Sequence, residues 1–309
     1  MSLKILAPVS SLKGAELQIK AGADEIYVGL EEPKIFRNLS FSGGGKGNNV
    51  TSYKEFKKII KLSHENGVLV NYAANIPLMV TSLEEYFLEY VEKGVEAEVD
   101  TLILGDIGSI LLIKDNNIDI PIVASVFNNI FNLEHVKLLK DLKVSRIVFP
   151  HKLTLEEMRE ITSSINGIKF EVFGHFGCSN IIGKCQLLHY WGESVNFGLI
   201  CRGKYAINVN STSYINVPIL DAGTDCTICS LTDLAEIGID IIKIVGRDKN
   251  PYFTSTITRI YRNMIDQLNE NTSSGLFKNN ILEKEPWWGY WCNDNRCKYR
   301  ENEVIRSYI

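Results

Sequence analysis

The chain has 309 residues, a formal net charge of -4, 45% hydrophobic and 23% charged residues, a globular composition that excludes wholesale disorder. It has no block of five or six Lys or Arg residues, which makes nucleic acid and anionic membranes less favoured partners. No apolar run approaches the ~18 residues that span a bilayer, so we expect a soluble cytoplasmic protein.

Eight short apolar segments rich in β-branched residues recur along the chain, with helical spacing between them. The predicted strands cover residues 3–9, 25–30, 68–76, 101–106, 121–126, 146–150, 169–177 and 240–247. Strict alternation of strand and helix predicts a parallel sheet. Eight units predict an α/β fold, a (β/α)8 TIM-like barrel with a Cys-rich insertion after strand 7 and a short C-terminal tail.

The expected division of the chain follows from two features. The connection after the seventh strand, residues 178–231, is far longer than the ~2 to 6 residues usual for such loops, and long loops in compact folds are usually functional. We therefore assign residues 1–271 to the barrel, including this loop. Residues 272–309 form a tail, whose Trp287, Trp288 and Trp291 indicate that it packs back on the barrel.

The seven cysteines all lie between residues 178 and 297. The number is odd and no secretory signal precedes them, so metal or redox chemistry is favoured over a disulfide framework. Five of them fall in the long loop after the seventh strand, namely Cys178, Cys185, Cys201, Cys226 and Cys229. Their spacing differs from the paired arms of a zinc ribbon and favours an iron-sulfur cluster, with structural zinc and unrelated buried thiols as alternatives.

Three further side chains are candidates for a site at the carboxyl ends of the strands. His175 lies three residues before Cys178 and is either a histidine bonded to backbone or an acid/base group. Lys243 shares one strand face with residues 241 and 245, so it must point into the barrel or be paired. Arg247 could hold a carboxylate, or form only a surface ion pair.

Taken together, three motifs resemble the U-32 peptidase family, also called collagenase-like peptidases. Residues 6–30 are similar to that family's first βαβ unit, "EVFGHFGC" with "GKC" to its cysteine signature, and "IIKIVGR" with the later "YR" to its Lys-Ile-x-Gly-Arg element. The resemblance runs from about residue 3 to residue 262. Phe127 and Val245 depart from the family's usual Gln and Glu, which indicates a changed substrate pocket.

The resemblance implies an oxygen-independent hydroxylase with a [4Fe-4S] cluster and a prephenate-like carboxylate as oxygen donor, acting on a small molecule or an RNA base. The implied ligands are Cys178, Cys185, Cys201 and Cys229, with Cys226 as the alternative fourth. Zinc is the alternative metal. A peptidase, or a non-catalytic iron-sulfur or zinc subunit of a heteromeric complex, remains the alternative function.

The remaining roles are assigned from position at the barrel mouth. Arg37, Lys243 and Arg247 would neutralise the carboxylates of the donor, Asn75 would line the mouth, and His175 would move a proton. A small-molecule substrate is favoured over RNA, and a homologous partner subunit is possible because compact family members pair.

Cys292 and Cys297 are predicted not to be cluster ligands. They lie in the aromatic tail, and two thiolates are half a tetrahedral set.

Overall fold

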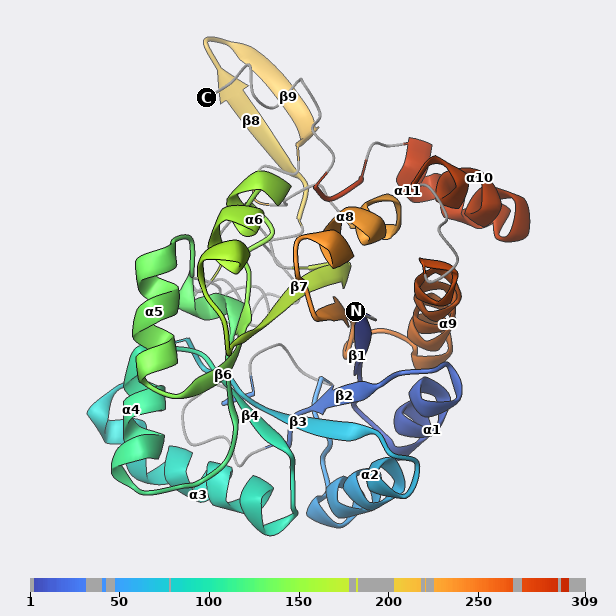
Figure 1. Ribbon diagram of the computed structural model, residues 1–309. Helices are drawn as coiled ribbons and strands as arrows, with labels where there is room; N and C mark the ends of the chain where they lie inside the picture. The colour runs from blue at the N-terminus through green and yellow to red at the C-terminus, as the bar shows by residue number, and fades with distance from the viewer. Residues whose placement is uncertain are drawn as a thin grey trace.

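The computed structural model describes residues 3–31, 41–42, 48–77, 79–177, 182, 203–217, 220, 225–268, 274–293 and 296–299. Eight parallel strands close into a barrel in the order β1-β10-β7-β6-β5-β4-β3-β2. Helices surround the barrel on the outside (Figure 1). The predicted (β/α)8 barrel is thus confirmed. Within the described part of the chain, no helix combines the length and apolarity needed to cross a bilayer.

All eight expected strands are present, although the sixth begins two residues earlier than predicted. They are β1 Lys4–Pro8, β2 Glu25–Val28, β3 Leu69–Ala74, β4 Thr101–Leu104, β5 Ile122–Ala124, β6 Val144–Val148, β7 Lys169–His175 and β10 Ile241–Ile244. The helices around them are α1 Leu12–Lys20, α2 Tyr53–Glu65, α3 Glu84–Glu96, α4 Ile107–Asp115, α5 Leu133–Asp141, α6 Leu155–Ser164, α8 Leu231–Glu236 and α9 Pro251–Leu268.

Five of the barrel helices, α1, α2, α4, α5 and α6, begin where a polar side chain accepts a hydrogen bond from a free backbone N–H group. The Ser11 hydroxyl accepts a hydrogen bond from the Gly14 N–H at the start of α1. Reciprocal capping boxes start α4, through Asp106 and Ser109, and α6, through Thr154 and Glu157. These capping residues can be recognised in the sequence, so the starts of these helices can be located from the sequence alone.

A second, small sheet lies inside the Cys-rich insertion. It is an antiparallel hairpin of β8 Tyr205–Val209 and β9 Thr212–Val217. Asn210 and Ser211 both have positive φ angles, 46° and 66°, as the two central residues of a tight hairpin turn require. The hairpin projects away from the barrel (Figure 1) and was not predicted.

The C-terminal segment contains α10 Ser274–Lys284 and α11 Gly289–Asn293. Trp288 and Trp291 are buried, whereas Trp287 is 41% exposed. The side chains of Trp288 and Trp291 contact His175 at ring-centroid distances of 5.0 and 4.6 Å. The division of the chain at residue 271 stays a prediction.

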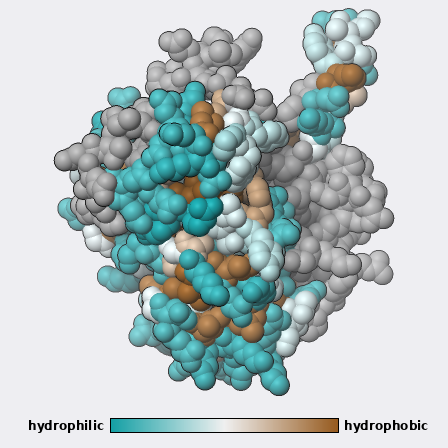
Figure 2. Space-filling model, turned by 90° about the vertical axis from the view of Figure 1, so that its right-hand side faces the viewer, coloured by the Kyte–Doolittle hydropathy of each residue, from teal (hydrophilic) through white to brown (hydrophobic). Residues whose placement is uncertain are grey.

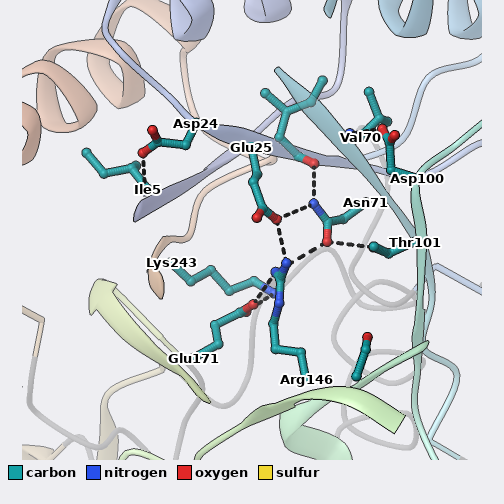
Figure 3. A network of polar contacts seen from close by, with 12 residues as sticks. Ile5, Asp24, Glu25, Val70, Asn71, Asp100, Thr101, Arg146, Glu171 and Lys243 are labelled. Carbon is teal, nitrogen blue, oxygen red and sulfur yellow. Dashed lines mark hydrogen bonds and ion pairs between the residues drawn. The ribbon is translucent and has the colours of Figure 1, made fainter. Parts of the chain in front are cut away.

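The interior of the barrel holds an apolar layer and a polar layer. The apolar layer is a cluster of its own, to which seven strands contribute Leu6, Tyr27, Ile103, Val123, Val148, Phe173 and Ile241. The polar layer lies closer to the amino ends of the strands, since Glu25 and Thr101 are the first residues of β2 and β4. Figure 3 shows this layer converging on Arg146.

Arg146 lies at the centre of the polar layer. Its Nη2 lies 2.7 Å from Glu25 Oε2 and its Nη1 lies 3.0 Å from Glu171 Oε2. The Asn71 amide donates to Glu25 and accepts from the Thr101 hydroxyl. Burial alone would lower the pKa of Arg146, but the two carboxylates raise it on balance.

We expect Arg146→Ala to lower the free energy of unfolding by about 3 to 5 kcal/mol, because it leaves the buried Glu25 without a cation and Glu171 with Lys243 alone. The matched control is Lys137→Ala, which breaks the exposed Lys137–Glu134 pair and should change it by about 0 to 1 kcal/mol. Urea denaturation of the three proteins measures both values. Equal losses in the two variants would contradict a dominant role for Arg146.

Candidate active site at the carboxyl ends of the strands

The structure describes six of the ten predicted site residues. Arg37, Cys178, Cys185 and Cys201 lie outside the described residues. The other six are Asn75, His175, Cys226, Cys229, Lys243 and Arg247. Where the structure describes the chain, no three His, Cys, Asp or Glu side chains come together as a metal site. The predicted ligand set is therefore seen only in part.

Lys243 extends from β10 into the barrel interior. Its Nζ atom lies 3.1 Å from Glu171 Oε1 and 4.5 Å from the centre of the Tyr27 ring. The residue is only 8% exposed, and it shares its strand face with Ile241 of the interior cluster. Both sequence-based alternatives, pointing inward and being paired, are thus realised. Its predicted role toward a carboxylate donor stays a prediction.

Arg247 follows β10 and reaches the loop after β2. Its Nη1 donates to Asn49 Oδ1 at 3.0 Å and its Nη2 donates to the Ser42 carbonyl at 2.8 Å. A Cβ atom at Gly29 would lie 2.5 to 2.7 Å from atoms of these three residues, so the close approach requires glycine there. Burial lowers the pKa of Arg247. Its guanidinium therefore holds a loop against the barrel mouth.

Amide groups gather where β3, β4 and β5 end. The Asn75 Nδ2 lies 3.4 Å from Ser125 Oγ, and the Asn128 Nδ2 donates to the carbonyls of Leu104 and Ser125. Because two carbonyls fix the nitrogen of Asn128, its Oδ1 must point elsewhere, and that buried oxygen has no hydrogen-bond partner among the described residues. The same holds for the buried Oδ1 of Asn75.

Sequence reasoning missed Asn128. The signal that could have found it is position, since polar residues just after a barrel strand lie at the face where barrel enzymes place their reactive groups.

His175 packs outside the barrel, against α9 and the C-terminal segment. The pairing of β7 with β10 shifts register between Lys243 and Ile244, so Phe173 faces the interior while His175 is aligned with Ile244 of the outer core. Its Nδ1 lies 3.4 Å from the Tyr261 hydroxyl, and its Nε2 is buried without a partner. Burial and the nearby Lys298 ammonium hold the pKa of His175 well below 6.5.

Tyr261 of α9 connects the end of β7 to the "CTIC" segment. Its hydroxyl donates to the Gly174 carbonyl at 2.6 Å and accepts from the Thr227 N–H at 3.1 Å. The same oxygen lies 3.9 Å from Cys226 Sγ. Burial raises the pKa of Tyr261 well above 10, so it stays a neutral donor. Tyr261 is the first residue of the "YR" element, whose part in the structure is therefore positioning.

The two described thiols of the insertion differ in their surroundings. Cys226 is buried in the hydrophobic core cluster, and its sulfur has hydrogen-bond contacts to the side chains of Trp288 and Tyr261. Burial raises the pKa of the Cys226 thiol to about 12. Cys229 is buried at the short 3-10 turn Ile228–Ser230, which leads into α8.

The tail pairs with the "CTIC" segment through an isolated β-bridge. The Asp225 N–H donates to the Arg296 carbonyl at 2.8 Å, and the Lys298 N–H donates to the Cys226 carbonyl at 2.7 Å. Cys297 pairs with Cys226 in a parallel bridge, and Cys226 pairs with His175 on its other side. Arg296 Nε lies 2.5 Å from Asp225 Oδ2. The tail therefore fixes the backbone on which two of the candidate ligands stand.

Comparisons with known proteins identify a protein family and several similar proteins. A family model described as peptidase family U32 matches residues 10–286. The tRNA hydroxylation protein P of Helicobacter pylori is 28% identical over 292 residues, 89% of this chain and 67% of that protein. The 23S rRNA 5-hydroxycytidine C2501 synthase of Escherichia coli is 27% identical over 87% of this chain and 40% of that protein. The solved U32 peptidase Mk0906 shares the fold, with a TM-score of 0.52, 11% identity, and coverage of 80% of this chain and 94% of that one.

The lowered pKa of His175 makes the stability of the fold depend on pH. The pKa of histidine in the unfolded chain is about 6.5. Below that pH the unfolded chain binds a proton that the buried imidazole does not, so this group lowers the free energy of unfolding by about 1.4 kcal/mol for each unit by which the pH decreases. We expect His175→Gln to remove that component of the slope between pH 5 and pH 6.5, in denaturation curves compared with those of the wild type. The exposed His64, replaced by Gln, is the control. An unchanged slope in His175→Gln would contradict the buried, neutral imidazole.

Proposed function

Because the chain belongs to peptidase family U32, we propose that it is a hydroxylase that adds oxygen to a base of RNA without using dioxygen. The observation that carries the proposal is that two relatives named for RNA hydroxylation align with 87% to 89% of the chain. This alignment favours RNA as the substrate, whereas the net charge of -4 favours a small molecule. We give the alignment more weight.

A [4Fe-4S] cluster is the proposed cofactor, and the two described cysteines of the insertion are compatible with it. Cys226 and Cys229 are both buried, and thiolates are the ligands that iron-sulfur clusters require. The "CTIC" segment is held from both sides, by His175 and Cys297, so its thiols have defined positions. When bound, the cluster would supply one-electron redox chemistry at the barrel mouth.

Cys229 is the proposed fourth ligand, beside Cys178, Cys185 and Cys201. The Cys226 sulfur already has contacts to Tyr261 and Trp288 within the hydrophobic core. A sulfur in that position packs as a structural thiol. Cys229 lies at the end of the same segment, in the middle of the 3-10 turn Ile228–Ser230 that leads into α8.

Hydroxylation converts a C–H bond of the base into C–OH, which is a two-electron oxidation. Without dioxygen, the donor must supply the oxygen atom and accept both electrons, and a prephenate-like carboxylate is the proposed donor. Arg37, Lys243 and Arg247 are proposed to balance its charge. The partnerless oxygens of Asn75 and Asn128 are suited to accept hydrogen bonds from N–H groups of the base.

The peptidase alternative rests on the family's name. Two of the four described histidines, His64 and His175, bond to Asp100 and lie beside Tyr261, respectively, and these contacts serve structure rather than a nucleophile.

The proposed activity is tested with protein purified without oxygen, incubated with RNA from cells that lack this gene and with prephenate. We expect a nucleoside that gains one oxygen atom in mass spectrometry, only when the protein and the donor are both present. Asn128→Asp is the matched site variant, because it keeps the shape but adds a charge, and it should lower turnover. Gelatin cleavage that tracks the protein, with no modified nucleoside, would contradict the proposal and favour a peptidase.

The ligand assignment is tested by iron and sulfide analysis. We expect Cys229→Ser to lose iron and the acid-labile sulfide, and Cys226→Ser to retain them. The double variant Cys292→Ser/Cys297→Ser should also keep the iron content of the wild type. Loss of iron from Cys226→Ser or from the tail variant, with an unchanged circular dichroism spectrum, would overturn the assignment. A zinc-loaded wild type without iron would overturn the cluster itself.

A further inference from the structure

The C-terminal segment contains a buried lysine, Lys298, which is only 2% exposed. Charged side chains usually lie at the surface, and hydrophilic residues cover much of the described part of the face shown in Figure 2. Burying an ammonium group costs free energy unless negative charge compensates it. The surroundings of Lys298 therefore bear on what this side chain does.

The backbone of Lys298 lies against the segment that carries Cys226 and Cys229. Its N–H donates to the Cys226 carbonyl at 2.7 Å, and its carbonyl accepts from the Ser230 hydroxyl at 3.3 Å. Ser230 directly follows Cys229, the proposed fourth cluster ligand. These two hydrogen bonds fix Lys298 beside that ligand.

The side chain of Lys298 extends to the carboxyl end of β7. A Cβ atom on Gly177 would lie 3.6 Å from Lys298 Cε and 3.7 Å from Lys298 Nζ. The same atom would lie 3.6 Å from Cγ of Phe173, which belongs to the interior apolar cluster. Gly177 directly precedes Cys178, another proposed ligand. Lys298 thus joins the two segments that carry Cys178 and Cys229, with its ammonium at the Cys178 end.

The described residues around this point carry net positive charge. The segments that meet here are residues 173–177, 225–230 and 296–299. With histidine neutral, their charged side chains are those of Asp225, Arg296 and Lys298. One carboxylate and two cations leave one positive charge. A [4Fe-4S] cluster held by four thiolates is an anion, so it would bring the opposite charge to this place.

We propose that Lys298 is a positioning residue for the iron-sulfur cluster, whose negative charge its ammonium compensates and whose reduction potential it raises. The inference rests on the proposed cofactor, and it gives a role to a residue outside the proposed ligand set. Reduction adds an electron to the cluster and makes it more negative, so a nearby cation stabilises the reduced form more than the oxidised form. Because Lys298 is buried, solvent and salt screen this attraction only weakly.

The proposal is tested by redox titration of the iron-loaded full chain, with dithionite as the reductant and electron paramagnetic resonance as the readout. We expect Lys298→Gln to shift the midpoint potential of the cluster to a more negative value. Lys298→Arg keeps the charge and should stay close to the wild type. The matched control Lys284→Gln removes an exposed ammonium from α10 of the same C-terminal segment and should leave the potential unchanged.

Two results would overturn the role of Lys298 and leave the proposed cofactor intact. One is an unchanged potential in Lys298→Gln at equal iron content, and the other is an equal shift in Lys298→Arg, which would assign the effect to packing. If Lys298→Gln retains too little iron for titration, iron content decides, and loss of iron from Lys298→Arg as well would contradict a role for the charge. A wild type without iron would overturn the proposed cofactor, and this inference with it.

Discussion

The closure of the barrel depends on one buried guanidinium. Arg146 binds the carboxylates of Glu25 and Glu171, and Glu171 in turn binds Lys243, so two anions and two cations neutralise one another inside the sheet. These four residues stand on β2, β6, β7 and β10, which joins opposite sides of the barrel. A buried charge without a partner costs several kcal/mol, so any strand that moved out of place would leave one.

The charged layer also determines how the cationic side chains at the barrel mouth are positioned. Lys243 is paired with Glu171 below it and lies over the Tyr27 ring, and Arg247 lies over the same ring from the loop side. The Lys243 cation is thus neutralised within the layer, and the Arg247 guanidinium is held in place by Asn49, the Ser42 carbonyl and the Tyr27 ring. The proposed anionic donor would meet these preorganised groups rather than mobile side chains.

A second set of contacts joins the cysteine-bearing segment to the rest of the molecule. Tyr261 binds the backbone of Gly174 and Thr227, while Cys297 of the tail forms a β-bridge with Cys226. Three segments far apart in the sequence thus meet at the carboxyl end of β7. The tail is part of this site's framework, which explains why its buried Trp288 and Trp291 contact His175.

The sequence by itself determined the barrel, because each strand and helix carries its own local signals of apolar period, cap and turn. It also determined that Lys243 must point into the barrel or be paired, because of strand alternation and the cost of burying charge, and the structure shows that both hold. Only the tertiary structure decided the place of His175, because a register shift between β7 and β10 is a property of two strands together. The partners of Arg247 and Cys226 and the contact of the tail with the "CTIC" segment likewise depend on contacts between distant segments, for which no local pattern in the sequence exists.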